Sequence, residues 1–134
     1  WEVKISSALF LLLNMATVFT KIINKEIPAD ILYEDDDVMA FRDIHPLAPV
    51  HILIIPKREI ASINDLVPED ALLAGKLILV ARTLARDLKI SEKGYKLLFR
   101  VGSDGGQEVP HIHLHLIGGT RLREDIGPVR RKEG

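Results

Sequence analysis

Apolar residues recur along the chain with two different spacings, one typical of helices and one typical of strands. The longest helical pattern covers residues 68–88, where a proline suits the first turn and basic side chains lie near the end. One wide apolar stripe runs along it, formed by Leu72, Leu73, Leu77, Val80, Ala81, Leu84 and Leu88. We interpret this stripe as a surface that packs on the core. A shorter helix is predicted from a cap at Thr17 or Thr20 to about Lys25.

The remaining apolar segments are short and have the character of strands. Residues 31–34 and 38–43 flank an acidic turn and predict a hairpin. Residues 50–55 are continuously apolar after the first two positions and predict a buried strand. Two more strands are predicted, at residues 96–101 and 110–117. Strands in runs with two separate helices indicate an α+β fold built around an antiparallel sheet.

Length and composition narrow the class of protein. The 134 residues carry 18 basic and 19 acidic side chains and no cysteine. This length indicates one domain, and the near-neutral charge argues against a polynucleotide partner. The lack of cysteine excludes disulfides, thiolate nucleophiles and zinc sites that use cysteine. No stretch approaches the roughly 20 apolar residues of a membrane span, so we expect no membrane partner.

The two ends of the chain differ in composition from its middle. Residues 1–14 contain an apolar stretch and are predicted to be an N-terminal extension that precedes a natural start at Met15. A secretory signal is the competing interpretation, but the acidic Glu2 offsets the basic charge that such a signal needs. Residues 121–134 are charged and aperiodic, which predicts a surface tail. The folded domain is then expected over residues 15–120.

Three of the five histidines alternate with aliphatic residues, at positions 111, 113 and 115. Successive side chains of a strand point to opposite faces, so His111, His113 and His115 are expected to share one face. An exposed polar face would be served equally well by residues that do not titrate near neutral pH. A metal site is the serious alternative, although the first and last ring of such a row lie roughly 13 Å apart on a straight strand.

A glycine-rich loop, residues 102–108, comes immediately before the histidines. Glycines at this density allow backbone N–H groups to turn together toward an anion. The loop alone is weak support for a site, because glycine-rich turns between strands are common. Imidazoles directly after an anion-binding loop provide a nucleophile, a proton donor and an orienting partner, which is what phosphoryl chemistry needs.

The histidine row resembles the signature of the histidine-triad superfamily: His, apolar, His, apolar, His and two apolar residues, His111 to Ile117. Other matching segments are residues 22–28, 40–44, 48–57, 105–107 and 118–119. Together they are similar to the HINT branch of nucleotide-binding phosphoramidases, over roughly residues 15–120. The resemblance implies an α+β HIT-like fold, an antiparallel sheet with two helices. It also implies a cytoplasmic homodimer whose sheet continues across the two-fold axis, where the long helix and strand 96–101 meet.

The resemblance further implies catalytic roles for four histidines. His113 is expected to be the nucleophile that attacks the α-phosphorus of a purine nucleoside 5′-phosphoramidate or an aminoacyl adenylate. His115 is expected to bind the phosphate and to help protonate the leaving amine, while His111 and His51 orient the nucleophilic ring. Such chemistry needs no cofactor, and a metal would compete for the lone pair that the nucleophile uses. A metal-independent enzyme is therefore predicted.

Substrate-binding roles also follow from the resemblance alone. Phosphate oxygens are expected to contact the loop at Gly106, the side chain of Gln107 and the backbone of Glu108. Asp43 is expected to bind the ribose hydroxyls of an AMP-like substrate. The purine is expected to lie against three apolar side chains, Ile27, Phe41 and Ile44. Without the family, those three would be ordinary core residues, Asp43 would be a turn cap, and His51 a buried histidine of the core.

The chain also departs from the pattern of this branch. Arg100 stands where an asparagine near the phosphate is common, and its guanidinium either strengthens phosphate binding or points away. Pro110 replaces the frequent aromatic residue before the histidines, and the C-terminal tail lacks the usual ending. Two other functions remain open: cleavage of dinucleoside polyphosphates, and nucleotide binding without turnover.

Overall fold

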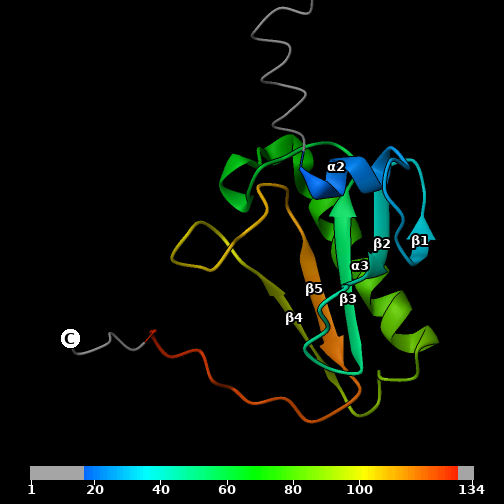
Figure 1. Cartoon of the computed structure of the whole chain (residues 1–134), viewed down its shortest axis with the longest axis vertical. Helices are drawn as coiled ribbons and strands as arrows, with labels where there is room; N and C mark the ends of the chain where they lie inside the picture. Colours follow the sequence, from blue (N-terminus) through cyan, green and yellow to red (C-terminus); the bar gives the residue numbers. More distant parts are fainter. Residues whose placement is uncertain (1–16, 130–134) are drawn as a thin grey trace, which may run out of the picture.

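Five antiparallel strands form one sheet, and two helices pack against it (Figure 1). The computed structural model describes residues 17–129, so the predicted extension 1–14 and the end of the predicted tail lie outside the described residues. The strands are β1 (Ile31–Glu34), β2 (Val38–Arg42), β3 (Val50–Pro56), β4 (Tyr95–Phe99) and β5 (Leu114–Gly118), in the spatial order β1-β2-β3-β5-β4. The predicted α+β fold is confirmed.

Both predicted helices form, and both are shorter than their apolar patterns. Helix α2 (Val18–Ile23) begins after Thr17, whose hydroxyl accepts the backbone N–H of Thr20 at 3.1 Å. Helix α3 (Ala71–Asp87) begins later than predicted, because Pro68–Asp70 form a separate 3-10 turn, η2, next to a second turn, η1 (Ile63–Asp65). Proline is compatible with the first turn of either kind of helix, so its position does not distinguish them.

Alternation along the central strands divides the core into two clusters, one on each face of the sheet. Ile52 and Ile54 of β3 pack toward α3, with Leu77, Val80, Ala81 and Leu84 of the helix stripe. Leu53 and Ile55 of the same strand point the other way, into a smaller cluster that contains Phe19 of α2. The predicted stripe therefore faces the core from Leu73 onward, whereas Leu72 is 89% exposed and was wrongly assigned to it. The face of the sheet toward α2 is the face on which His51 lies, because it is two residues from Leu53.

The prediction of a strand over residues 110–117 was wrong at its beginning. The ladder starts at Leu114, and the N–H groups of His111 and Ile112 bond to Val109 and Ile60 outside the sheet. Proline has no N–H to donate, so Pro110 cannot join such a ladder. The alternation of faces nevertheless continues upstream, since Ile112 packs in the same cluster as Leu114. His111 and His113 therefore lie on the α2 side although they precede the strand.

No helix within residues 17–129 is long and apolar enough to cross a membrane.

Candidate active site

A cavity of about 400 Å³ opens on the α2 side of the sheet. Most of the predicted site residues line it: His51, His113, His115, Ile27, Phe41, Asp43, Ile44, Gly106 and Glu108. Two predicted residues, His111 and Gln107, contact neighbouring protein groups instead of the cavity. Segments as distant as α2, β2 and the glycine loop thus meet around the end of the histidine row.

The register between β3 and β5 brings two of the histidines together. His115 is paired with Leu53, so both side chains point to the same face. His51 lies two residues before Leu53 and shares that face, which makes His51 and His115 diagonal neighbours across the ladder. Their ring centroids are 5.2 Å apart, and His51 Nε2 lies 2.9 Å from His115 Nδ1. The sheet itself therefore holds this pair.

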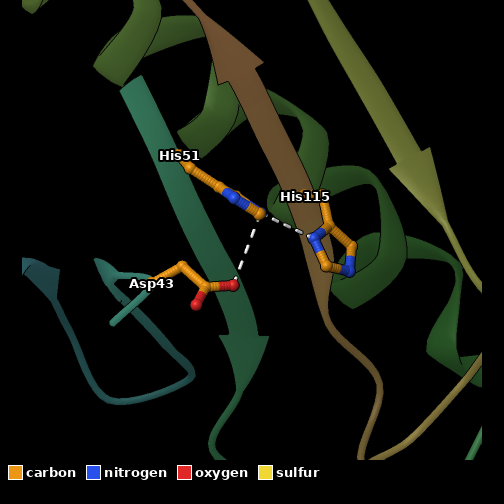
Figure 2. Close-up of side chains that lie close together, drawn as sticks. All are labelled: Asp43, His51 and His115. Atoms are coloured by element: carbon orange, nitrogen blue, oxygen red, sulfur yellow. Dashed lines mark hydrogen bonds and ion pairs between the residues drawn. The ribbon is translucent and has the colours of Figure 1, made fainter. Parts of the chain in front are cut away.

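The tautomers of His51 and His115, which Figure 2 shows side by side, both follow from one backbone N–H group. The N–H of Leu47 donates to His51 Nδ1 at 3.1 Å, so this nitrogen is an acceptor and the proton of the neutral ring is on Nε2. His51 Nε2–H then donates to His115 Nδ1. His115 consequently carries its own proton on Nε2, and that atom is buried with no hydrogen-bond partner among the described residues.

His113 has the opposite arrangement of its two nitrogens. Its Nδ1 lies 2.7 Å from the backbone carbonyl oxygen of His111, which can only accept, so Nδ1 carries the proton. The lone pair of His113 is therefore on Nε2. The ring centroids of His113 and His115 are 5.0 Å apart. A free lone pair and a free N–H donor are thus adjacent in one cavity.

His111 is fully buried and acts as a support for this pair. Its Nε2 donates to the carbonyl oxygen of Pro56 at 2.7 Å, at the end of β3. This bond anchors the segment whose carbonyl oxygen holds His113. The predicted orienting role of His111 stays a prediction; its backbone oxygen contacts His113 Nδ1, and its ring lies outside the cavity lining.

All four histidines have pKa values below the ordinary value, mainly because burial penalises the charged ring. For His51 and His113, Asp43 opposes the effect of burial and Arg100 adds to it. His115 is lowered furthest: burial, followed by His113, His51 and Arg100, brings its pKa to about 4. Neutral rings are therefore expected at pH 7, which keeps the lone pair of His113 available for attack.

Asp43 lies at the mouth of the cavity, just after β2. One of its oxygens, Oδ1, accepts the N–H of His45 at 2.9 Å, which is the turn cap considered above. The other oxygen, Oδ2, lies 3.5 Å from His51 Nε2 (Figure 2). The two oxygens thus serve the turn and the cavity at the same time.

Comparison with known proteins identifies the family of this chain. The profile described as "HIT domain" matches residues 24–122. The chain belongs to the HIT family. Purine nucleoside phosphoramidase of Escherichia coli K12 is 49% identical over 118 residues, 88% of this chain and 96% of that protein. The solved HIT family hydrolase of Legionella pneumophila has a TM-score of 0.81 and 49% identity, covering 84% of this chain and all (100%) of that one. A histidine triad nucleotide-binding protein of Candida albicans has a TM-score of 0.68 at 32% identity, covering 82% of this chain and 87% of that one.

Gln107 of this HIT domain holds the glycine loop in place. Its Nε2 donates to the carbonyl oxygens of Ala61 and Val109 at 2.7 and 3.0 Å, and its Oε1 accepts the N–H of Gly102 at 3.1 Å. These bonds tie the loop to the segment after β3. The predicted contact between the Gln107 side chain and phosphate stays a prediction, and the amide has this second, structural role.

Two contributors to the site were not identified from the sequence. Phe19 of α2 packs edge-on against His113 and His111, with centroid distances of 5.0 and 6.0 Å. Leu47 lines the cavity and donates its backbone N–H to His51 Nδ1. Phe19 looks like any other apolar position of a short helix, and a backbone donor leaves no mark on the residue type, so neither carries a sequence signal.

Asp43, His51 and His115 are also the group within residues 17–129 that could hold a metal ion, with ligand atoms within 4.8 Å of one another. Coordination through His51 Nε2 requires a lone pair on that atom, so its proton would have to move to Nδ1. There it would face the N–H of Leu47, and two donors would oppose each other. The cluster therefore fits a proton better than a metal.

Proposed function

We propose that this HIT protein hydrolyses purine nucleoside 5′-phosphoramidates, AMP-linked amines, through a nucleotidyl intermediate on His113. The observation that carries the proposal is the Nδ1 contact of His113 with the His111 carbonyl oxygen, which directs the lone pair on Nε2 into the cavity beside the His115 donor. The 49% identity to Escherichia coli purine nucleoside phosphoramidase supports the same substrate class.

The apolar end of the cavity is the proposed site of the purine. Phe41 is buried and packs against Phe19 with a centroid distance of 5.6 Å, which gives this end a rigid aromatic wall. Ile27 lines the cavity and packs against the same cluster as Phe41, and Ile44, also in the lining, is 83% exposed. Asp43 lines the cavity two residues after Phe41 and 3.5 Å from His51 Nε2, so its carboxylate can accept hydrogen bonds from the ribose hydroxyls.

In the first step the lone pair of His113 Nε2 forms a bond to the α-phosphorus, and the bond from phosphorus to the amine nitrogen breaks. The electron pair of that bond leaves with the amine, which needs one proton. His115 supplies it from Nε2, while its Nδ1 takes the proton of His51 Nε2 at 2.9 Å. Between the two steps the His51–His115 pair lacks one proton, and its negative charge is balanced by the positive charge of the nucleotidyl ring of His113.

The second step returns the enzyme to its starting state. After the relay, His115 has its proton on Nδ1 and a free lone pair on Nε2, so it now acts as a base. Water attacks the phosphorus, its proton passes to His115 Nε2, and the bond to His113 Nε2 breaks with return of its electron pair. The Nδ1 proton passes back to His51 Nε2, which restores the starting tautomers, and AMP is released. Splitting the displacement into two steps lets a preorganised imidazole replace water as the first nucleophile.

Turnover of an adenosine 5′-phosphoramidate by wild type and His113→Ala tests the proposal. We expect release of amine by the wild type and a loss of at least about 10³-fold in the variant. Mass spectrometry of enzyme that has been quenched during turnover without acid should find AMP on the peptide that contains His113. His45→Ala is the matched control: this exposed histidine also lines the cavity, but it bonds to Asp43 through its backbone N–H, which the substitution keeps, so the variant should retain most of the activity.

Two other outcomes select the alternative functions. Faster cleavage of diadenosine polyphosphates than of the phosphoramidate, again dependent on His113, would replace the proposal with polyphosphate hydrolysis. Equal inactivity of wild type and His113→Ala, with AMP bound by both, would leave a nucleotide-binding module. Each result contradicts phosphoramidate hydrolysis as the main function.

The cytoplasmic homodimer remains part of the proposal. Support comes from the outward face of α3, where Leu72, Ile78 and Leu79 are exposed apolar residues, and from β4, an edge strand whose five residues are all only partly buried. Pairing of two such edges would continue the sheet. Light scattering should give twice the chain mass for the wild type and a monomer for Leu79→Glu.

A further inference from the structure

Arg100 brings a positive charge to the catalytic histidines. Leu98 of β4 is paired with His115, and Phe99 with Leu114, in the antiparallel ladder with β5. Continuing this register by one residue places Arg100 beside His113. Arg100 is two residues after Leu98 and therefore lies on the face that Leu98 and His115 share. In agreement, its side chain lines the cavity.

The other side of Arg100 faces the glycine loop. A Cβ atom built at Gly106 would lie 3.7 Å from both Cδ and Nη1 of Arg100. Gly106 has a φ of +81°, a conformation that suits glycine, and it lines the same cavity. The guanidinium is thus held between the loop and the end of the histidine row.

This charge has no acidic partner within the described part of the chain. The ion pairs within residues 17–129 do not include Arg100, although its side chain is partly buried. Arg42, another cation of the lining, is paired with Asp30 at 3.1 Å. The carboxylate of Asp43 is engaged by His45 and His51. A partly buried guanidinium beside a neutral nucleophile is available for an anion.

We propose that Arg100 is a further catalytic residue, whose guanidinium binds the non-bridging phosphoryl oxygens while His113 attacks. This inference rests on the proposed function, since it concerns the same phosphoryl group. The planar guanidinium offers five N–H donors in a fork that matches two oxygens of one phosphate. Donors aimed at oxygens on which charge builds up lower the barrier more than they strengthen binding of the substrate.

Three variants on β4 or directly after it separate this role from a general effect of charge. Arg100→Gln removes the positive charge and leaves a shorter side chain with a single amide donor group. Arg100→Lys keeps the positive charge but loses the planar set of N–H donors. Lys96→Gln is the matched control, because it removes one positive charge from the same strand at a residue outside the cavity lining, where Lys96 bonds to the carbonyl oxygen of Arg123. Each variant is assayed on the adenosine 5′-phosphoramidates of tryptamine and of tryptophan, which differ by one carboxylate on the amine.

We expect Arg100→Gln to lower kcat/KM by about 10²-fold on both substrates, mainly through kcat, with partial recovery in Arg100→Lys. Lys96→Gln should stay within about threefold of the wild type. A loss of kcat/KM confined to the tryptophan compound would overturn the proposal, because Arg100 would then bind the carboxylate of the leaving group. Equal rates of wild type and Arg100→Gln would overturn it as well.

The pH profile provides a readout that a purely structural role would not move. The charged and titratable residues that line the cavity are Arg42, Asp43, His45, His51, Arg100, Glu108, His113 and His115. Arg100 lowers the pKa values of His51, His113 and His115, whereas Asp43 raises them. The acid limb of kcat/KM should therefore move to higher pH in Arg100→Gln and stay in place in Arg100→Lys. An unmoved limb in Arg100→Gln contradicts the proposed contact.

Calorimetry with AMP and with adenosine distinguishes failure of this inference from failure of the proposed function. Absence of turnover by the wild type would overturn phosphoramidate hydrolysis. Binding still tests Arg100 in that case. Arg100→Gln should lower the affinity for AMP by about tenfold and leave the affinity for adenosine unchanged, because only AMP has the phosphate. Equal AMP affinity in wild type and variant would overturn the phosphoryl contact.

Discussion

His113 Nδ1 lies 2.7 Å from the carbonyl oxygen of His111, two residues earlier in the same segment. This local contact fixes the ring by a backbone atom, so it does not depend on the protonation of another side chain. His115 is fixed differently, through His51 and the N–H of Leu47. The two adjacent rings consequently expose opposite functions to the cavity, a lone pair and a donor.

The tautomers are open to direct measurement. In ¹⁵N-edited NMR spectra at pH 7.5, we expect His113 as the Nδ1–H form and His51 and His115 as Nε2–H forms, because each ring faces a group of fixed polarity. Assignment by single substitution of each histidine provides the control. An Nε2–H signal from His113 would contradict the proposed nucleophile.

Substitutions at His51 should separate its hydrogen bond from its bulk. His51→Gln retains an N–H donor that can reach His115 Nδ1, whereas His51→Phe fills the space without one. We expect kcat to fall by about 10²-fold in both variants, because the Gln amide can orient His115 but does not give up its proton. Urea unfolding of both variants controls for stability. A loss of less than about tenfold in His51→Gln would mean that His51 only orients His115 and that the relay is not used.

Chelation should leave the activity unchanged. The N–H of Leu47 opposes the proton shift that metal coordination by His51 would require. We expect kcat/KM after prolonged incubation with EDTA to equal that of the untreated enzyme, measured on the same phosphoramidate. Loss of activity on chelation, restored by one added divalent metal, would refute the interpretation of Asp43, His51 and His115 as a proton path.

Stability should decrease on acidification in a window set by the buried histidines. Below pH about 6.5 the unfolded chain binds protons that the folded rings resist, so the free energy of unfolding falls as pH falls. The folded pKa of His115 is about 4. Its contribution to the free energy of unfolding, on the order of 3 kcal/mol, is therefore lost by the time the pH has fallen to that value. Urea midpoints between pH 7.5 and 4.5 measure this loss. His115→Gln should flatten the profile, and an identical slope in that variant would contradict the depressed pKa.

Gln107 offers a test of whether its amide serves the loop or the phosphate. Gln107→Ala removes three bonds to backbone groups of the loop and its neighbours, so we expect a loss of about 1–2 kcal/mol in the free energy of unfolding. The partner groups are partly exposed and regain water, which keeps the loss small. Unchanged stability with a large rise in KM would instead indicate that the side chain acts mainly on phosphate.

Elements whose pattern is local were predictable from the sequence. All of the stripe on α3 except Leu72 faces the core, the cap at Thr17 forms, and His113 and His115 share the face on which the cavity opens. These outcomes depend on residue spacing of 3.6 or 2, which the order of side chains already contains. The alternation even survives through Ile112, where the hydrogen-bonded strand itself has not yet begun.

Contacts between side chains and backbone groups could not be predicted from the sequence. No spacing relates Leu47 to His51 Nδ1, or Gln107 to Ala61, because each contact joins a side chain to a backbone group whose polarity is the same in every residue except proline. Helix and strand ends were misjudged for a similar reason, since Pro68 and Pro110 constrain their own backbone but not the ladder around them. The sequence by itself determined which rings share a face. Only the tertiary structure decided where each proton resides, because that depends on the donor or acceptor that folding brings opposite each nitrogen.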